Sequence, residues 1–326
     1  MKKEFKKTIK GKTILYNLFM YKNKRESSIA SIEFTIPYYD KISKSYKIDR
    51  VDGLIVDNDI VIFISQSGET ADTIAALKLA KENGAKTLAV TNVIGSSITR
   101  EADYSVYTHA GPEIAVASTK AYTSQITLLS ILAIHFAEIL EKKLDKAEEL
   151  KNDILLLPNQ VEEVLKTADQ VKNFAKKVYK EKDMFFIGRG ADYTVALEGS
   201  LKLKEISYIH SEAYPSGELK HGPIALIENG VTVISVLTNE LLVEKSISNI
   251  QEVVTRGAKT FIVTNQDLSE ELTSSFDTVI NIPKTNVLIS PILSVIPLQL
   301  LAYYISKEKG LDVDKPRNLA KSVTVE

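Results

Sequence analysis

A charged and polar run between residues 202 and 223 contains side chains that could move protons. Lys202 and Glu205 are three positions apart, so on a helix the ammonium and the carboxylate would share one face. A carboxylate beside an ammonium can serve as a general acid or base. The same spacing also fits an ordinary surface ion pair, and spacing alone does not separate the two. His221 precedes Gly222-Pro223 in a predicted loop, which makes it a better acid/base candidate than His109 or His135.

A second candidate for chemistry is Lys321, close to the C-terminal end of the sequence. It follows a predicted helix stop at Gly310 and is itself followed by an apolar, strand-like ending. Chain tails are poorly ordered unless they are tied down, so this apolar ending predicts a docked tail. A partly desolvated lysine can form a Schiff base with a carbonyl substrate.

Residues 65–70 read Ser-Gln-Ser-Gly-Glu-Thr and directly follow an apolar, β-branched stretch. Residues 71–82 then show helical periodicity, which places this loop between a strand and a helix N-terminus. Free backbone N–H groups and the helix dipole favour an anion there, and hydroxyl and amide side chains add donors for a phosphate. A simple helix N-cap is the alternative. The candidate phosphate-binding side chains are Ser65, Gln66, Ser67 and Thr70.

An internal repeat indicates the elements that position these residues. Residues 84–92 recur as residues 257–265, an offset of 173 positions from Gly84 to Gly257, with the same residue at most positions. The offset also relates the strand before Ser65 to residues 233–237, and the apolar helix at 122–139 to residues 292–305. Each half alternates strands and helices, which predicts an α/β fold with a parallel sheet flanked by helices. We place the two halves at residues 1–155 and 156–326.

The second half contains Gly188-Arg189-Gly190 after its first strand. Glycines there fit phosphate binding, and they fit close packing of the strand on the helix equally well. The offset relates this turn to residues 15–17, which contain no glycine.

Composition limits the classes of function. The chain has 326 residues, a net charge of −1, and 44% hydrophobic and 25% charged residues, as in an ordinary globular protein. Nothing in the charge predicts nucleic acid or a membrane as a partner. The sequence has no cysteine and four histidines, which removes thiol chemistry and leaves little material for a metal site. We expect no metal and no cofactor, and a cytoplasmic location.

Several of these stretches together resemble one enzyme family, the isomerase half of glutamine:fructose-6-phosphate aminotransferase, from about residue 59 onward. The resemblance is carried by five segments, residues 65–70, 113–120, 201–212, 218–223 and 316–326. It implies two tandem SIS (sugar isomerase) domains, each a flavodoxin-like three-layer sandwich. It further implies an aldose–ketose isomerase that forms glucosamine 6-phosphate from fructose 6-phosphate.

The resemblance also implies a role for each matched residue. Glu205 would shuttle the proton between C1 and C2, Lys202 would assist it, and Lys321 would form the Schiff base. His221 would open the sugar ring and would come from a neighbouring subunit, so a homodimer is expected. Ser65, Gln66, Ser67 and Thr70 would hold the phosphate. Ala320 and the backbone near Val116 would line the sugar.

Two departures from the family bear on function. The family has a glutaminase domain with an N-terminal cysteine, and this sequence has neither, so ammonia would come from outside, for example from a separate glutaminase. Residues 16–19 stand where the family has a Cys-Gly-Thr-Ser loop, and a bulky loop there could weaken sugar binding. The alternatives are therefore a catalytically silent sugar-phosphate-binding remnant, and an amino-sugar-phosphate isomerase or deglycase of the same superfamily.

Overall fold

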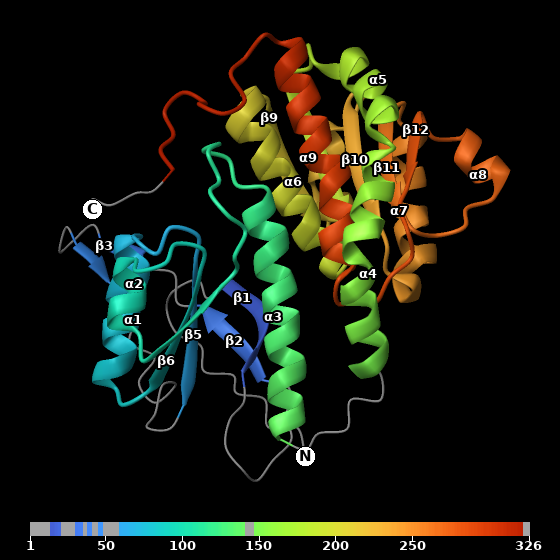
Figure 1. Ribbon diagram of the computed structural model, residues 1–326. Coiled ribbons are helices and arrows are strands. Elements are labelled where there is room, and N and C mark those ends of the chain that lie inside the picture. Colours follow the sequence, from blue (N-terminus) through green and yellow to red (C-terminus); the bar gives the residue numbers. More distant parts are fainter. Residues whose placement is uncertain are drawn as a thin grey trace. The chain divides into compact units, whose positions relative to one another are not determined.

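The computed structural model describes residues 59–140 and 147–321 in full. Ahead of them it gives the backbone of four strands, β1 (Ile14–Met20), β2 (Ala30–Phe34), β3 (Tyr38–Asp40) and β4 (Ser45–Lys47). The chain divides into two compact units (Figure 1). The first comprises Met1–Gly111 and Ala320–Glu326, and the second comprises Pro112–Leu319.

The first unit contains a parallel sheet in the order β5-β6-β7, formed by β5 (Ile60–Ser65), β6 (Lys86–Thr91) and β7 (Tyr104–Tyr107). Helices α1 (Ala71–Glu82) and α2 (Ser97–Glu101) follow the first two of these strands. Phe63, Leu77 and Ile98 are buried together, so both helices cover the sheet. The predicted helix at 71–82 is confirmed. β1 pairs with β2, and β3 with β4, both antiparallel.

The second unit is built on a five-stranded parallel sheet in the order β12-β11-β10-β8-β9. Its strands are β8 (Asp183–Gly188), β9 (His210–Pro215), β10 (Thr232–Leu237), β11 (Lys259–Thr264) and β12 (Thr278–Asn281). Its helices are α3 (Lys120–Ile139), α4 (Ala147–Leu165), α5 (Ala168–Val178), α6 (Ala191–Ser207), α7 (Val243–Val254), α8 (Glu270–Ser274) and α9 (Ser290–Glu308). Three short 3₁₀ segments complete it: η1 (Leu219–His221), η2 (Pro223–Leu226) and η3 (Glu240–Leu242).

Side chains of this sheet alternate between two hydrophobic cores. Met184 and Phe186 of β8 join a cluster that also includes residues of α5, α6 and α9. Phe185 and Ile187 point to the opposite face, where they pack with residues of α7 and η1. Figure 1 shows α6 and α9 side by side on one face of the sheet. The second unit is therefore helix–sheet–helix in layers, which confirms the predicted α/β class and explains why its central strands are buried on both faces.

The repeat predicted from the sequence has a structural counterpart in both units. In the first, the backbone N–H of Thr87 donates to the Asp103 carboxylate at 2.8 Å, and the Thr87 hydroxyl donates to the same oxygen at 2.9 Å. In the second, Thr260 makes the same two bonds to Asp277, at 2.8 and 3.2 Å. We call these two arrangements the Thr–Asp clasps. Each ties a strand to the turn that precedes the next parallel strand.

The division predicted at residue 155 stays a prediction. Residue 155 lies within α4, and α3 and α4 both belong to the second compact unit. Residues 15–17, onto which the offset maps the glycine turn of the second half, lie within β1.

Candidate active site

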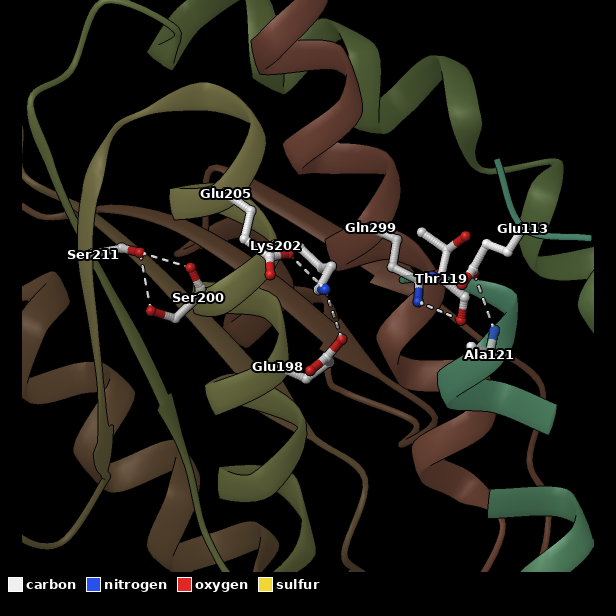
Figure 2. A network of polar contacts seen from close by, with 9 residues as sticks. All are labelled: Glu113, Thr119, Ala121, Glu198, Ser200, Lys202, Glu205, Ser211 and Gln299. Atoms are coloured by element: carbon white, nitrogen blue, oxygen red, sulfur yellow. Dashed lines mark hydrogen bonds and ion pairs between the residues drawn. The ribbon is translucent and has the colours of Figure 1, made fainter. Parts of the chain in front are cut away.

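Helix α6 carries an ammonium group between two carboxylates. Lys202 Nζ lies 2.6 Å from Glu205 Oε2 and 3.5 Å from Glu198 Oε1 (Figure 2). The three residues follow each other at spacings of four and three, so they share one face of the helix. Lys202 is only 4% exposed, which rules out the exposed surface ion pair that the spacing also allowed. We call Glu198, Lys202 and Glu205 the α6 array.

The α6 array holds two carboxylates and only one ammonium. Burial raises the pKa of Glu198, the Lys202 charge opposes that shift, and the Glu205 charge adds to it. Burial, together with the charge of Glu198, also raises the pKa of Tyr122 on α3. Glu198, with its raised pKa, gives the site a second carboxyl group that holds a proton more readily than an ordinary glutamate does. Such a group suits transfer of a proton between neighbouring carbons of a substrate.

The loop before α3 is held by a carboxylate and contacts the chain near its C-terminal end. Glu113 Oε1 accepts hydrogen bonds from the N–H of Thr119 at 2.9 Å and of Ala121 at 3.3 Å, which caps the helix (Figure 2). Gln299 of α9 donates to the Thr119 carbonyl at 3.4 Å. The Val116 N–H donates to the carbonyl of Asp314 at 3.0 Å, so this predicted site residue lies beside the C-terminal segment.

The hydroxyl loop at residues 65–70 is folded by its own side chains. Ser65 Oγ accepts from the N–H of Gly68 at 3.0 Å, and Ser67 Oγ accepts from the N–H of Glu69 at 3.2 Å. Thr70 is the N-cap residue of α1 and its side chain makes no capping bond, so the simple N-cap alternative fails for this hydroxyl. Gln66 Oε1 is buried with no hydrogen-bond partner among the described residues. Among the described residues neither of these serine hydroxyls donates a hydrogen bond, which leaves both protons available for a ligand.

Hydrogen bonds from helix α2 hold this loop in place. The Glu69 carboxylate accepts from the N–H and the hydroxyl of Ser97, at 2.8 and 2.6 Å. These bonds, the side-chain bond first, lower the pKa of Glu69. The N–H of Ile98 donates to the Gly68 carbonyl at 2.9 Å. Glu69 therefore serves the shape of the loop and not the ligand.

Gly68 is the position in this loop most sensitive to an added methyl group. Its φ is +69°, and a Cβ there would lie 2.2 Å from Ser96 Oγ and 2.8 Å from Ile98 Cγ2. Gly95 is a matched control, with φ +72° and nothing within 4 Å of an added Cβ. We expect Gly95→Ala to cost about 1–2 kcal/mol from backbone strain, and Gly68→Ala about 1–3 kcal/mol more from overpacking. Urea unfolding of both variants checks this, and equal costs would contradict the packing argument.

The remaining predicted site residues lie in both units. His221 is exposed at the end of η1, where its N–H donates to the carbonyl of Glu218 at 3.0 Å. Ala320 is exposed, Lys321 is partly buried, and both are grouped with the unit that contains residues 65–70. Residues 322–326 lie outside the described residues.

The described residues contain neither a metal-binding cluster nor a membrane-spanning helix. Across residues 59–140 and 147–321 no cluster of three or more His, Asp or Glu side chains is arranged to hold a metal ion. No helix in the part of the chain that the structure describes combines the length and the apolar character needed to cross a membrane.

Sequence reasoning missed Glu198. The signal was present, because Glu198 stands one helical turn before Lys202 in the sequence Glu-x₃-Lys-x₂-Glu. The prediction used only the Lys202 and Glu205 end of that pattern.

Comparison with known proteins decides the family. The family model described as the SIS domain matches residues 38–135 and 177–306. This chain belongs to the SIS domain family. The two matched segments fall in the two halves of the repeat, and this SIS chain therefore carries two SIS segments.

Relatives of this SIS chain include two enzymes named glutamine–fructose-6-phosphate aminotransferase (isomerizing). The one from Clostridium perfringens is 59% identical over 277 residues, which is 84% of this chain and 45% of the relative. The one from Thermococcus kodakarensis is 51% identical over 274 residues, again 84% of this chain and 45% of the relative. The SIS chain thus spans less than half the length of these relatives.

Solved structures agree with this assignment. The C-terminal domain of glucosamine-fructose-6-phosphate aminotransferase from Francisella tularensis is 40% identical, with a TM-score of 0.73, covering 81% of this chain and 75% of that one. A glucosamine-6-phosphate deaminase from Thermotoga maritima is 25% identical with a TM-score of 0.63, over 81% and 75% of the two chains. The SIS chain is thus homologous to the isomerase part of the aminotransferase.

Proposed function

We propose that this chain is a sugar-phosphate aldose–ketose isomerase that forms glucosamine 6-phosphate from fructose 6-phosphate, with ammonia supplied from outside the chain. The observation that carries the proposal is the buried α6 array, in which Lys202 lies 2.6 Å from Glu205 and 3.5 Å from Glu198. Isomerisation needs one proton moved between adjacent carbons, and a partly buried carboxylate held by a buried ammonium can do this. The names of the relatives support the substrate class.

The phosphate group would be held by the hydroxyl loop. Ser65 and Ser67 keep O–H donors, Gln66 has a buried amide oxygen without a partner, and Thr70 makes no capping bond. The N-terminus of α1 adds partial positive charge at this loop. Ala320 and the backbone at Val116 would line the sugar.

The chemistry balances without an added oxidant or reductant. Lys321 Nζ attacks the C2 carbonyl of the open-chain ketose, and loss of water leaves an imine. Ammonia displaces the lysine and leaves a C2 imine of the sugar. Glu205 then removes a proton from C1 to give an enolamine, and protonation at C2 with loss of the O1 proton yields the aldehyde. Lys202 stabilises the Glu205 carboxylate during these steps.

His221 would open the sugar ring, contributed by the neighbouring subunit of a homodimer. It is exposed in the described chain, which leaves it accessible to a partner. A separate glutaminase would be one source of ammonia, and we place the enzyme in the cytoplasm.

The test of this function is a titration of fructose 6-phosphate into the purified protein with ammonium present. We expect glucosamine 6-phosphate in the NMR or mass spectrum, and glucose 6-phosphate as a side product when ammonium is omitted. Saturable binding with neither product would reject the isomerase.

Lys321 can be tested by trapping the imine. Reduction with cyanoborohydride in the presence of fructose 6-phosphate should leave a covalent sugar adduct on the wild-type protein, and none on Lys321→Ala. Lys315→Ala, an exposed lysine in the same segment, is the matched control and should still form the adduct. Peptide mass mapping identifies the modified lysine, and an adduct elsewhere would contradict the assignment.

A second candidate is a protein that binds sugar phosphate without turnover. It is favoured by residues 16–19, which lie inside strand β1. The family has at this place a loop that completes the binding site for the sugar phosphate. Isothermal titration that detects fructose 6-phosphate binding in the absence of product would support it.

A further inference from the structure

The repeat gives the second unit its own version of the hydroxyl loop. The offset of 173 positions carries Ser65 onto Thr238 and Gln66 onto Asn239, and each loop follows the first strand of a β–α–β unit, β5 in the first unit and β10 in the second. In the first loop the buried Gln66 oxygen has no partner among the described residues. The second loop, in contrast, already holds an anion.

That anion is the carboxylate of Asp192, from the first turn of α6. Its Oδ2 accepts from the N–H of Thr238 at 2.9 Å and from the N–H of Asn239 at 3.2 Å, and its Oδ1 accepts from the Thr238 hydroxyl at 2.5 Å. Asp192 is 2% exposed, and within residues 147–321 no lysine or arginine forms an ion pair with it. Burial raises the pKa of the Asp192 carboxyl group, and the three hydrogen bonds from Thr238 and Asn239 oppose that shift by stabilising the charged form.

The backbone around α6 is shaped to bring this carboxylate in. Gly188 ends β8, and a Cβ there would lie 2.4 Å from the carbonyl carbon of Asp192. Gly190, the N-cap residue of α6, has φ +59°. Gly188 therefore serves close packing of the strand on the helix, the alternative that glycine spacing left open, and Gly190 supplies the positive φ at the start of α6.

We propose that Asp192 replaces the ligand anion in the second unit, so that this loop is closed to phosphate and serves as the anchor of α6. Two negative charges within hydrogen-bond distance of the same donors repel each other, so phosphate cannot share the loop with Asp192. The chain then binds one sugar phosphate, at residues 65–70, and this count rests on the proposed function. Asp192 is a positioning residue, because it holds the helix that carries Lys202 and Glu205.

The anchoring role of Asp192 is tested by removing its carboxylate in a variant and supplying a small carboxylate, formate, in solution. Asp192→Gly should lower the Tm by roughly 5–10 °C, as expected for loss of a buried, fully bonded group. Sodium formate should recover much of that loss, because formate can occupy the emptied space, whereas sodium chloride at the same ionic strength should not. Inorganic phosphate is tested in the same way, as a second anion that could occupy the emptied space in Asp192→Gly. A formate effect on stability and on the activity of Asp192→Gly, without one on the wild type, identifies an anion site.

Two further variants sharpen the result. Asp169→Gly removes an exposed carboxylate from the first turn of α5 and should show a small loss of Tm and no recovery in formate. Asp192→Asn should also be less stable than the wild type, because the amide carries no charge. Formate should not rescue this variant, because the amide still fills the space. If Asp192→Gly folds only in formate, the yield of folded protein replaces the Tm as the readout. Equal behaviour of Asp192→Gly in formate and chloride overturns the proposal.

The count of ligands is measured separately by titration with fructose 6-phosphate. We expect one equivalent per wild-type chain, and none after the double change Ser67→Ala and Thr70→Ala. Two equivalents on the wild type would show that the second loop is open. Absence of sugar binding combined with formate rescue would reject the proposed function and leave the anchor intact.

Discussion

Lys202→Met should lower the free energy of unfolding by about 3–5 kcal/mol, because it leaves two carboxylates of the α6 array without their cation. Methionine fills much of the volume of the lysine stem, so the loss reports charge and not a cavity. Lys204→Met is the matched control on the same helix, and its exposed side chain should change stability by no more than about 0.5 kcal/mol. Urea unfolding of both variants measures the difference.

The loss in Lys202→Met should depend on pH in a defined direction. Burial already raises the pKa of Glu198, and removing the ammonium takes away the main effect that opposes this shift. A carboxyl group with a raised pKa in the folded state stabilises the fold at low pH and ceases to do so as pH rises through that pKa. The variant should therefore be closest to the wild type below about pH 4.5, the ordinary pKa of a glutamate, and should lose stability relative to it as the pH rises above that value. A loss of stability that is the same below and above that pH would contradict the charge argument.

Glu205→Gln should reduce formation of glucosamine 6-phosphate by roughly 10²–10⁴-fold, the usual effect of removing a general base. The amide cannot accept the C1 proton, and it keeps the size of the side chain. Binding of fructose 6-phosphate should persist, because residues 65–70 are unchanged, so kcat should fall far more than KM rises. Glu163→Gln, an exposed glutamate of α4, is the control. A parallel loss of sugar binding would indicate a structural role for Glu205 and not a catalytic one.

Sequence reasoning located the elements well where short-range patterns determine them. The helix predicted at 71–82 matches α1 because its apolar positions repeat at helical spacing. The repeated segments form β6 and β11, in which every residue after the first lysine is buried. The spacing of Lys202 and Glu205 likewise predicted their shared face.

What the sequence could not supply were properties set by distant contacts. The burial of Lys202 depends on packing of α6 against α9, a helix about a hundred positions further along the chain. Asp192 was missed because its partners, Thr238 and Asn239, are 46 and 47 positions away. The exposure of His221 is equally a matter of tertiary context, and its role stays a prediction.

The two Thr–Asp clasps affect the order in which the chain acquires structure. Each clasp joins residues only 16 or 17 positions apart, so forming it closes a short loop at low entropic cost. Contacts of such low sequence separation form early. Each clasp sets the register of one pair of parallel strands within its own unit, β6 with β7 and β11 with β12. We therefore expect each unit to nucleate independently, so that the second unit can reach its native fold during synthesis or refolding even when changes in residues 1–58 slow or misdirect the first.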